Sequence, residues 1–177
     1  MTTYIAFLRG INVGGHKKVP MADLRKGLEG MGLEHVKTYI QSGNVVFTSN
    51  ADKVSLRSDM EAHCLKVFGF HIDIALKTLK ELQDIISSCP YDINDVPEGG
   101  NVYFVLATDE LPDTMETELA TRADGKDDYT LTGHTLFLFL RQSIRTTPLA
   151  KAIKTDVTTR NWNTMHKLLA LAEDITE

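Results

Sequence analysis

A glycine-rich stretch near the N-terminus has the residue types that bind phosphate. It runs from Gly10 to Lys17, reads GINVGGHK, and lies between an expected strand and an expected helix. Backbone N–H groups in that setting can hold an anion. The spacing is not that of a P-loop, because His16 stands where the lysine is needed and Lys17 comes one place late. We expect either a looser anion site or a turn that packs closely against its sheet. The donors of that anion site would be Arg9, Asn12, Gly14, Gly15, Lys17 and Lys18.

A second polar cluster, TTRNWNT, spans Thr158 to Thr164 and precedes an apolar, helix-periodic tail. Thr158, Thr159 and Asn161 are of the types that cap helix N-termini. A cation such as Arg160 is disfavoured at that position by about 0.3–1 kcal/mol. We expect a negative group to compensate, either a carboxylate from the acidic segment 92–128 or a bound anion. The ligand donors here would be Arg160, Asn161 and Asn163.

The other reactive side chains form no catalytic or metal-binding pattern. The QSG turn at Ser42 resembles a nucleophile elbow, but Ile40 replaces the first glycine and the context is strand–turn–strand. The six histidines lack ligand spacing, and Cys64 and Cys89 fit buried or half-buried thiols. We therefore assign no catalytic residue, metal ligand or cofactor.

The charge is uneven along the chain. The formal net charge of −5 argues against general binding to nucleic acid or to an anionic membrane. Between Arg141 and Lys167 there are six bases and one acid, whereas Asp92 to Asp128 holds eleven acids and two bases. The two segments could face each other or both be solvated. With no membrane-length apolar run and no secretory signal at the N-terminus, we expect a cytoplasmic protein.

Hydrophobic periodicity predicts the elements that carry these motifs. Residues 3–8 are typical of a strand, and Pro20 fits the first turn of a helix that ends at Gly32. Two strands follow, separated by a QSGN hairpin turn in which Gly43 or Asn44 can take a positive φ. A helix up to Gly69 and a strand at 71–76 complete the order βαββαβ, which is that of a ferredoxin-like fold.

The second half repeats a related order, strand–helix–hairpin–helix. Thr78 and Glu81 form an expected capping box, and the hairpin turns at Gly133 and His134. Thr147 and Pro148 open a short helix, and the final helix runs from about 161 to 174. The chain is thus expected to be an α+β protein with mostly antiparallel sheets. Its two ferredoxin-like α/β halves would span residues 1–77 and 78–177, and they could form one compact unit.

We expect the first and third strands to be parallel neighbours. The glycine-rich stretch and the QSGN turn would then leave opposite ends of the sheet, unless the long loop folds back across one face. The final helix can adjoin only one of those ends. We place it beside the glycine-rich stretch, because both segments are basic.

Three stretches, LRGINVGGHKKVPMADL (8–24), VKTYIQSGNVVF (36–47) and TTRNWNTMHKLLAL (158–171), resemble the signature segments of a known family. It is the mostly bacterial family called domain of unknown function 1697. The resemblance spans nearly the whole chain and implies a fold of two ferredoxin-like α/β halves. It implies no activity or cofactor.

The leading functional hypothesis is binding of a small anionic ligand, a nucleotide or a phosphorylated metabolite. RNA binding on an RRM-like sheet is an alternative, but the third strand offers one aromatic residue, Phe47, where a stacking platform needs two or three. A protein-interaction module without a ligand is the other alternative.

Overall fold

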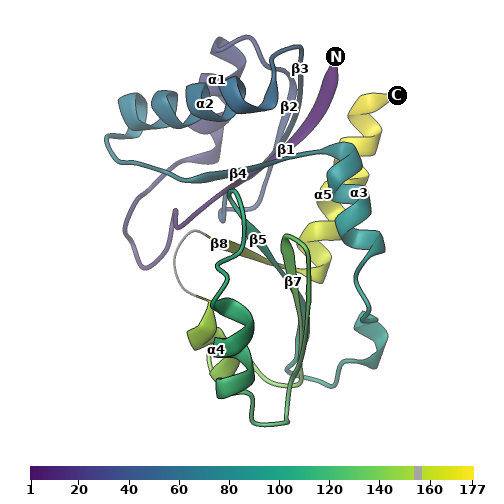
Figure 1. Ribbon diagram of the computed structural model, residues 1–177. Coiled ribbons are helices and arrows are strands. Elements are labelled where there is room, and N and C mark those ends of the chain that lie inside the picture. The colour runs from purple at the N-terminus through teal and green to yellow at the C-terminus, as the bar shows by residue number, and fades with distance from the viewer. Residues whose placement is uncertain (154–156) are drawn as a thin grey trace. The chain divides into compact units, whose positions relative to one another are not determined.

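The computed structural model describes residues 1–153 and 157–177, which form two compact units (Figure 1). The first unit contains Met1–Asp84 and His166–Glu177, and the second contains Ile85–Met165. Lys154 and Asp156 of the basic segment lie outside the described residues. The helices described include none that is both long and apolar enough to cross a membrane.

The first unit has the predicted order βαββαβ. Its four-stranded sheet has the strand order β2-β3-β1-β4. In chain order the elements are β1 (Thr2–Leu8), α1 (Met21–Gly30), β2 (Glu34–Tyr39), β3 (Asn44–Ser49), α2 (Lys53–Phe68) and β4 (Ile74–Thr78), and α3 (Leu79–Ser87) follows. The capping box predicted at the start of α3 is confirmed. Glu81 Oε2 accepts from the N–H of Thr78, and Thr78 Oγ1 accepts from the N–H of Glu81.

The prediction that the first and third strands are parallel is wrong. All three strand pairs of this sheet are antiparallel, and Phe7 of β1 pairs with Asn44 of β3. In an antiparallel pair the end of one strand lies beside the start of the other. The glycine-rich stretch after β1 and the turn before β3 therefore leave the sheet at the same end.

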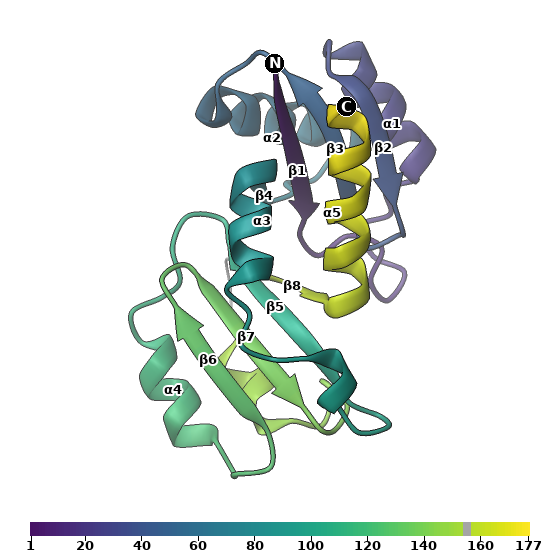
Figure 2. The same cartoon turned by 90° about the vertical axis from the view of Figure 1, so that its right-hand side faces the viewer.

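Both faces of the first sheet are covered. One face packs against α1 and α2, and on it Tyr4 and Phe47 stack with their ring centroids 5.7 Å apart. The side chains that point the other way, such as Ile5 and Phe7, are also fully buried. Residues of α5 (Trp162–Thr176) that belong to this unit lie against the second face (Figure 2). There, Thr3 and Thr176 share a hydroxyl hydrogen bond of 2.7 Å.

The second unit also contains a four-stranded antiparallel sheet, in the order β6-β7-β5-β8. Its elements are η1 (Ile93–Asp95), β5 (Asn101–Ala107), α4 (Met115–Arg122), β6 (Asp128–Thr132), β7 (Thr135–Leu140), η2 (Pro148–Ala152) and β8 (Val157–Asn161). The hairpin turn at Gly133 and His134 and the short helix after Thr147 are confirmed, the latter as a 3₁₀ helix. The two antiparallel sheets with their helices confirm the predicted α+β class.

Strand β8 was not predicted, because its residues were interpreted as the cap of the final helix. Val157 to Asn161 instead pair with β5, and Arg160 lies opposite Phe104. The segment contains three β-branched residues, which suit an extended strand. Of the three predicted caps only Asn161 acts as one, because its Oδ1 accepts from the N–H of Thr164 at 3.0 Å.

Substitution of Gly100 tests how tightly β5 and β7 pack. A Cβ at Gly100 would lie 2.0 Å from the carbonyl oxygen of Leu140, and backbone cannot move aside as a side chain can. We expect Gly100→Ala to lower the free energy of unfolding by about 3 kcal/mol, measured by urea denaturation. Gly30→Ala, at the open end of α1, is the control and should be neutral or slightly stabilising. Equal changes in the free energy of unfolding for Gly100→Ala and Gly30→Ala would contradict this packing.

Candidate functional site

The glycine-rich loop and the turn before β3 form one structure at the end of the first sheet. The N–H of Leu8 donates to the carbonyl of Gly43 at 2.8 Å, which continues the β1–β3 pairing into the turn. Gly43 has φ +88, and a Cβ there would lie 2.6 Å from Ile11 Cδ1 and 2.9 Å from Leu8 Cβ. Glycine at this position therefore allows the loop to pack directly on the turn.

Asn12 fixes the loop in place. Its Nδ2 donates to the carbonyls of Val19, at 3.0 Å, and Gln41, at 2.7 Å. Its Oδ1 accepts from the N–H of Val19 at 2.8 Å. An asparagine side chain has two N–H donors, and both are used here on backbone carbonyls. Asn12, predicted as a ligand donor, thus builds the wall of the site.

Unusual backbone conformations are concentrated around this loop. Among residues 1–153 and 157–177, the non-glycine residues with positive φ are Asn12 (+56), Lys17 (+48), His35 (+55) and Ile40 (+49). Three of these four belong to the loop or the turn. Ile40 is the most unusual, because β-branched residues rarely adopt this conformation. The turn was expected to place positive φ at Gly43 or Asn44. Gly43 takes it, whereas Asn44 is a buried residue of β3.

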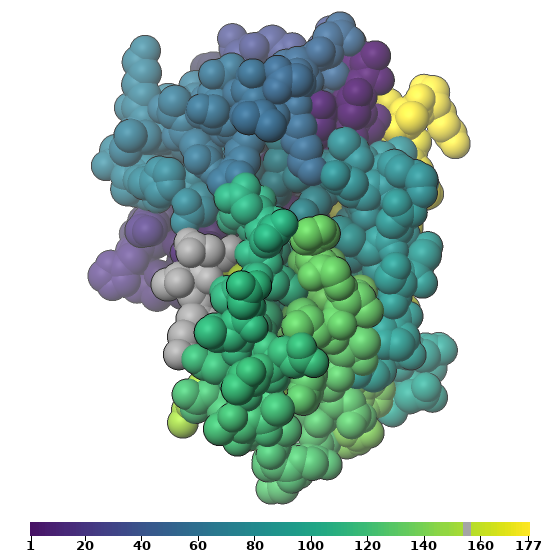
Figure 3. All heavy atoms as spheres, in the orientation of Figure 1, coloured from purple at the N-terminus to yellow at the C-terminus, as the bar shows by residue number. Residues whose placement is uncertain are grey.

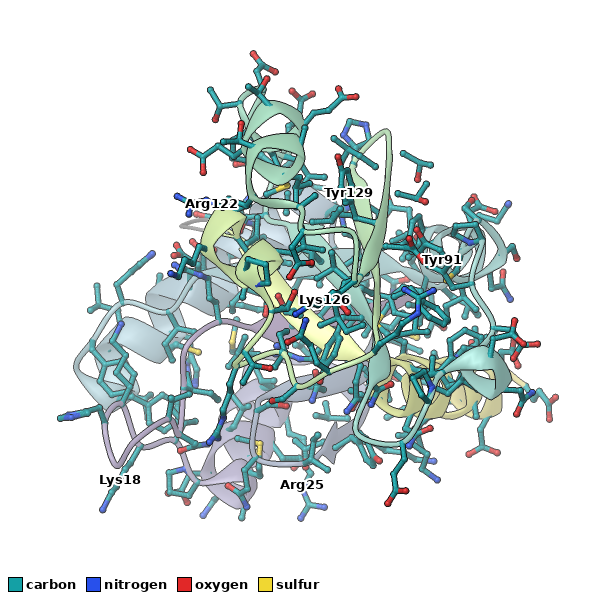
Figure 4. The ribbon with its side chains drawn as sticks, turned by 90° about the horizontal axis from the view of Figure 1, so that it is seen from below. Lys18, Arg25, Tyr91, Arg122, Lys126 and Tyr129 are labelled. Atoms are coloured by element: carbon teal, nitrogen blue, oxygen red, sulfur yellow. The ribbon has the colours of Figure 1, made fainter. Side chains whose placement is uncertain are left out.

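An open hollow of about 410 Å³ lies between the loop and the turn. Its lining consists of Asn12, Gly15, Lys18, Val19, Pro20 and Gln41. The structure therefore brings together three of the predicted binding residues, namely Asn12, Gly15 and Lys18. Gly14 and Lys17 lie in the same exposed stretch. Figure 3 shows purple, N-terminal parts of the chain at the surface of the first unit. Figure 4 shows Lys18 extending outward from the loop.

Arg9 is held at the base of the loop by Asp73. Its N–H donates to the Asp73 carbonyl at 3.0 Å, and its Nη1 lies 3.5 Å from Asp73 Oδ2. The other carboxylate oxygen of Asp73 lies 2.8 Å from His71 Nε2. Arg9 does not line the hollow, and an internal carboxylate already compensates its charge.

Arg160 lies in β8, one residue before Asn161, which caps α5. Its Nη1 donates to Thr158 Oγ1 at 2.7 Å and to the Thr159 carbonyl at 3.1 Å. The residue is 8% exposed, and this burial lowers the pKa of Arg160 to about 10. The guanidinium remains charged at neutral pH.

The predicted binding residues are divided between the two units. The glycine-rich loop belongs to the first unit, whereas Arg160, Asn161 and Asn163 belong to the second. The hollow at the loop is built by first-unit residues alone. Gln41, which also lines it, was not assigned to the predicted anion site. The antiparallel β1–β3 pairing was the signal that would have placed Gln41 beside the loop.

The remaining reactive side chains lie elsewhere. Within the described parts of the chain, no group of three His, Cys, Asp or Glu residues is arranged to hold a metal ion. The two cysteines are free thiols, Cys64 buried and Cys89 half-buried, as predicted. Burial raises the pKa of Cys64 to about 11, and burial also raises the pKa of Cys89.

These features define an α+β protein with two antiparallel four-stranded sheets and a glycine-rich loop packed on a neighbouring turn. The chain belongs to the family described as "Protein of unknown function (DUF1697)", whose model matches residues 1–137. No match was found among curated proteins.

Two solved structures are similar to this chain to different degrees. The conserved bacterial protein SP0830 from Streptococcus pneumoniae has a TM-score of 0.79 and 25% sequence identity. That alignment covers 97% of this chain and 98% of the other. An unknown protein from Galdieria sulphuraria, at 10% identity, aligns over 98% of this chain and 91% of its own with a TM-score of only 0.28. The first comparison supports the fold described here.

Replacement of Asn12 tests its structural role. Asn12→Gly keeps the freedom to adopt φ +56 but removes all three side-chain hydrogen bonds. We expect a loss of about 2 kcal/mol in the free energy of unfolding, measured by chemical denaturation. Asn50→Gly, at an exposed bend in the same unit, serves as the control. Unchanged stability in Asn12→Gly would show that the three bonds do not hold the loop.

The thiols should differ in reactivity. Ellman's reagent at pH 8 should modify half-buried Cys89 first. Cys64 should react only when the protein opens, because its side chain is buried. With a pKa of about 11, about one Cys64 thiol in a thousand is ionised at pH 8. The Cys89→Ser variant should lose the faster phase. Rapid modification of Cys64 in the native protein would contradict its burial.

Proposed function

We propose that the hollow beside the glycine-rich loop binds a small anion, a phosphate group carried by a nucleotide or another phosphorylated metabolite. The observation that carries this proposal is the occurrence of three positive-φ residues in the loop and the turn that form the hollow. Asn12 lines the hollow, and Lys17 and Ile40 directly precede the lining residues Lys18 and Gln41. Such conformations cost free energy and are concentrated at ligand sites, where the surrounding structure holds them in place.

The electrostatics of the loop support an anionic ligand. Lys17 and Lys18 are consecutive and exposed, and Lys18 lines the hollow. Pro20 also lines the hollow and occupies the N-cap position of α1. The N-terminus of α1 carries partial positive charge, and no side chain at the N-cap position hydrogen-bonds to it. Asp23 in the first turn of α1 offsets part of that charge.

The glycine backbone supports close approach of a ligand. Gly14 and Gly15 have φ +59 and +76, and no atom lies within 4 Å of where a Cβ at Gly15 would be. Backbone in which left-handed residues recur can present N–H groups to an anion. The hollow, at about 410 Å³, falls within the usual range for small-molecule sites.

The proposal rests on the first unit alone. Arg160, Asn161 and Asn163 stay predicted donors of the second unit, and the cytoplasmic location stays a prediction. The RNA-binding alternative gains no support, because Ile5, Phe7 and Val46 on the face away from α1 and α2 are fully buried. An RNA-stacking sheet needs exposed aromatic rings.

One observation favours a protein-interaction module as the second candidate. Val13 and Ile40 are large apolar residues that are 66% and 49% exposed, and each is adjacent in sequence to a residue of the Asn12–Gln41 hydrogen bond. A contiguous exposed apolar patch marks a protein contact, whereas isolated exposed apolar residues are common on protein surfaces. A partner that binds Val13 and Ile40 would lose affinity on Val13→Ser, whereas phosphate binding would not change.

Titration of ¹⁵N-labelled protein with inorganic phosphate, ribose 5-phosphate and AMP tests the anion site. We expect the amide signals of Gly14, Gly15 and Lys18 to shift, and the shifts to weaken with added salt. The double variant Lys17→Ala/Lys18→Ala should bind the best probe about tenfold more weakly. Lys26→Ala/Lys66→Ala removes the same charge from exposed helix positions of the same unit and is the control.

Two results would overturn the anion site. One is the absence of any shift at Gly14 and Gly15 with every probe up to about 10 mM. The other is an equal loss of affinity in the two double variants, which would indicate a general charge effect.

A further inference from the structure

We propose that the second unit binds a nucleotide in a hollow at the end of β7, separate from the loop site. This hollow has a volume of about 520 Å³ and is lined by Gly125, Lys126, Asp128, Arg141 and Gln142. Lys126 is labelled in Figure 4, on the face of the molecule that also presents Tyr91. Two cations, one carboxylate and one amide thus surround a single open space.

Arg141 is exposed, yet three contacts fix its guanidinium. Nη1 donates to the Lys126 carbonyl at 2.8 Å, and Nη2 donates to Asp128 Oδ2 at 2.9 Å. The Cζ atom lies 4.7 Å from the centroid of the Phe139 ring. A surface arginine loses rotamer entropy when it is held in this way. A fixed guanidinium at the edge of a hollow is therefore preorganised for a ligand.

Phe139 and Asp128, which contact the Arg141 guanidinium, are fixed by contacts of their own and by the sheet. Tyr91 packs on Phe139 with ring centroids 5.4 Å apart, and its hydroxyl lies 2.7 Å from Thr130 Oγ1. Asp128 lies opposite Phe139 in the β6–β7 register, so the two side chains share one face of the sheet. The Phe139 ring and the Asp128 carboxylate thus both contact the guanidinium from this face of the sheet.

A buried carboxylate fixes the backbone behind the hollow. Asp127 is 5% exposed, and its Oδ1 accepts from the N–H of Arg141 at 2.8 Å. Its Oδ2 accepts from Gln142 Nε2 and Thr147 Oγ1, each at 2.7 Å. The position of Arg141 is thus set by both its main chain and its side chain.

The lining chemistry matches a planar base with an attached phosphate. One face of the guanidinium covers Phe139, and the side chain, 45% exposed, also borders the hollow, where a heteroaromatic ring can stack on it. The Asp128 carboxylate has acceptor capacity beyond its Arg141 bond, which suits an exocyclic amino group. Exposed Lys126 supplies the charge for a phosphate.

Gly125 allows such a ligand to reach the backbone. It has φ +79, and nothing lies within 4 Å of where its Cβ would be. Packing alone accounts for the contact between Arg141 and Phe139, because the guanidinium covers a core ring. A nucleotide would use the open hollow beside that contact, together with exposed Lys126 and the accessible backbone of Gly125.

Titration of the ¹⁵N-labelled full chain with AMP, CMP, UMP and ribose 5-phosphate tests this proposal. We expect AMP to shift the amide signals of Gly125, Lys126 and Gln142, with ribose 5-phosphate binding there about tenfold more weakly because it lacks the base. CMP should bind more tightly than UMP, which lacks the amino group. Shifts at Gly14 and Gly15 report on the other site, so each proposal can fail without the other.

Substitutions separate stacking from charge. Arg141→Lys keeps the charge but loses the planar group, and it should weaken AMP binding about tenfold. Arg145→Lys is the matched control, exposed and outside the lining, and should bind AMP as the parent does. Lys126→Ala should weaken binding of AMP but not of adenosine. The melting temperature of each variant reports whether the fold is kept.

Several outcomes would overturn the proposal. One is that Gly125 and Gln142 are unmoved by AMP up to about 10 mM. A second is equal affinity for AMP and ribose 5-phosphate, as measured at these amide signals. A third is an equal loss of AMP affinity in Arg141→Lys and Arg145→Lys. Equal affinity for CMP and UMP would overturn the role given to Asp128.

Discussion

The antiparallel pairing of β1 with β3 determines what the glycine-rich loop can contact. Phe7 lies opposite Asn44, so the chain that leaves β1 starts beside the chain that enters β3. Gly43 lets Ile11 and Leu8 approach the turn within a distance that any side chain would block. The Asn12–Gln41 hydrogen bond and the hollow both depend on this pairing, because with parallel strands the loop and the turn would lie at opposite ends.

Local signals in the sequence predicted most of the elements. Hydrophobic periodicity located the strands and helices of the first unit, and the Thr78–Glu81 capping box and the Gly133 turn were recognisable because each motif uses few consecutive residues. No short motif of consecutive residues indicates the direction of β3 relative to β1. It follows from the βαββαβ connection, in which β1 and β2 run in the same direction with β3 antiparallel between them.

Strand β8 shows why residue type alone misled. Threonine and asparagine cap helices, but threonine is also β-branched and favours strands. The pairing of Thr158–Asn161 with β5, more than fifty residues earlier in the chain, decided between these preferences. Arg160 is consequently a buried strand residue, one position before the cap of α5. The loop residues could be proposed as a candidate site from the sequence, whereas the place of Gln41 beside them depends on the tertiary pairing.

The three left-handed residues of the loop and the turn, Asn12, Lys17 and Ile40, differ in what their side chains contribute. Asparagine adopts this conformation readily, and Asn12 gains three hydrogen bonds there. Lys17 and Ile40 each lose about 1–2 kcal/mol relative to a conformation they prefer, and glycine at either position would avoid that loss. Neither is buried: Lys17 is exposed, and Ile40 is 49% exposed. Core packing therefore does not account for the presence of Lys17 and Ile40. At the proposed anion site, Lys17 contributes a positive charge that a glycine would lack.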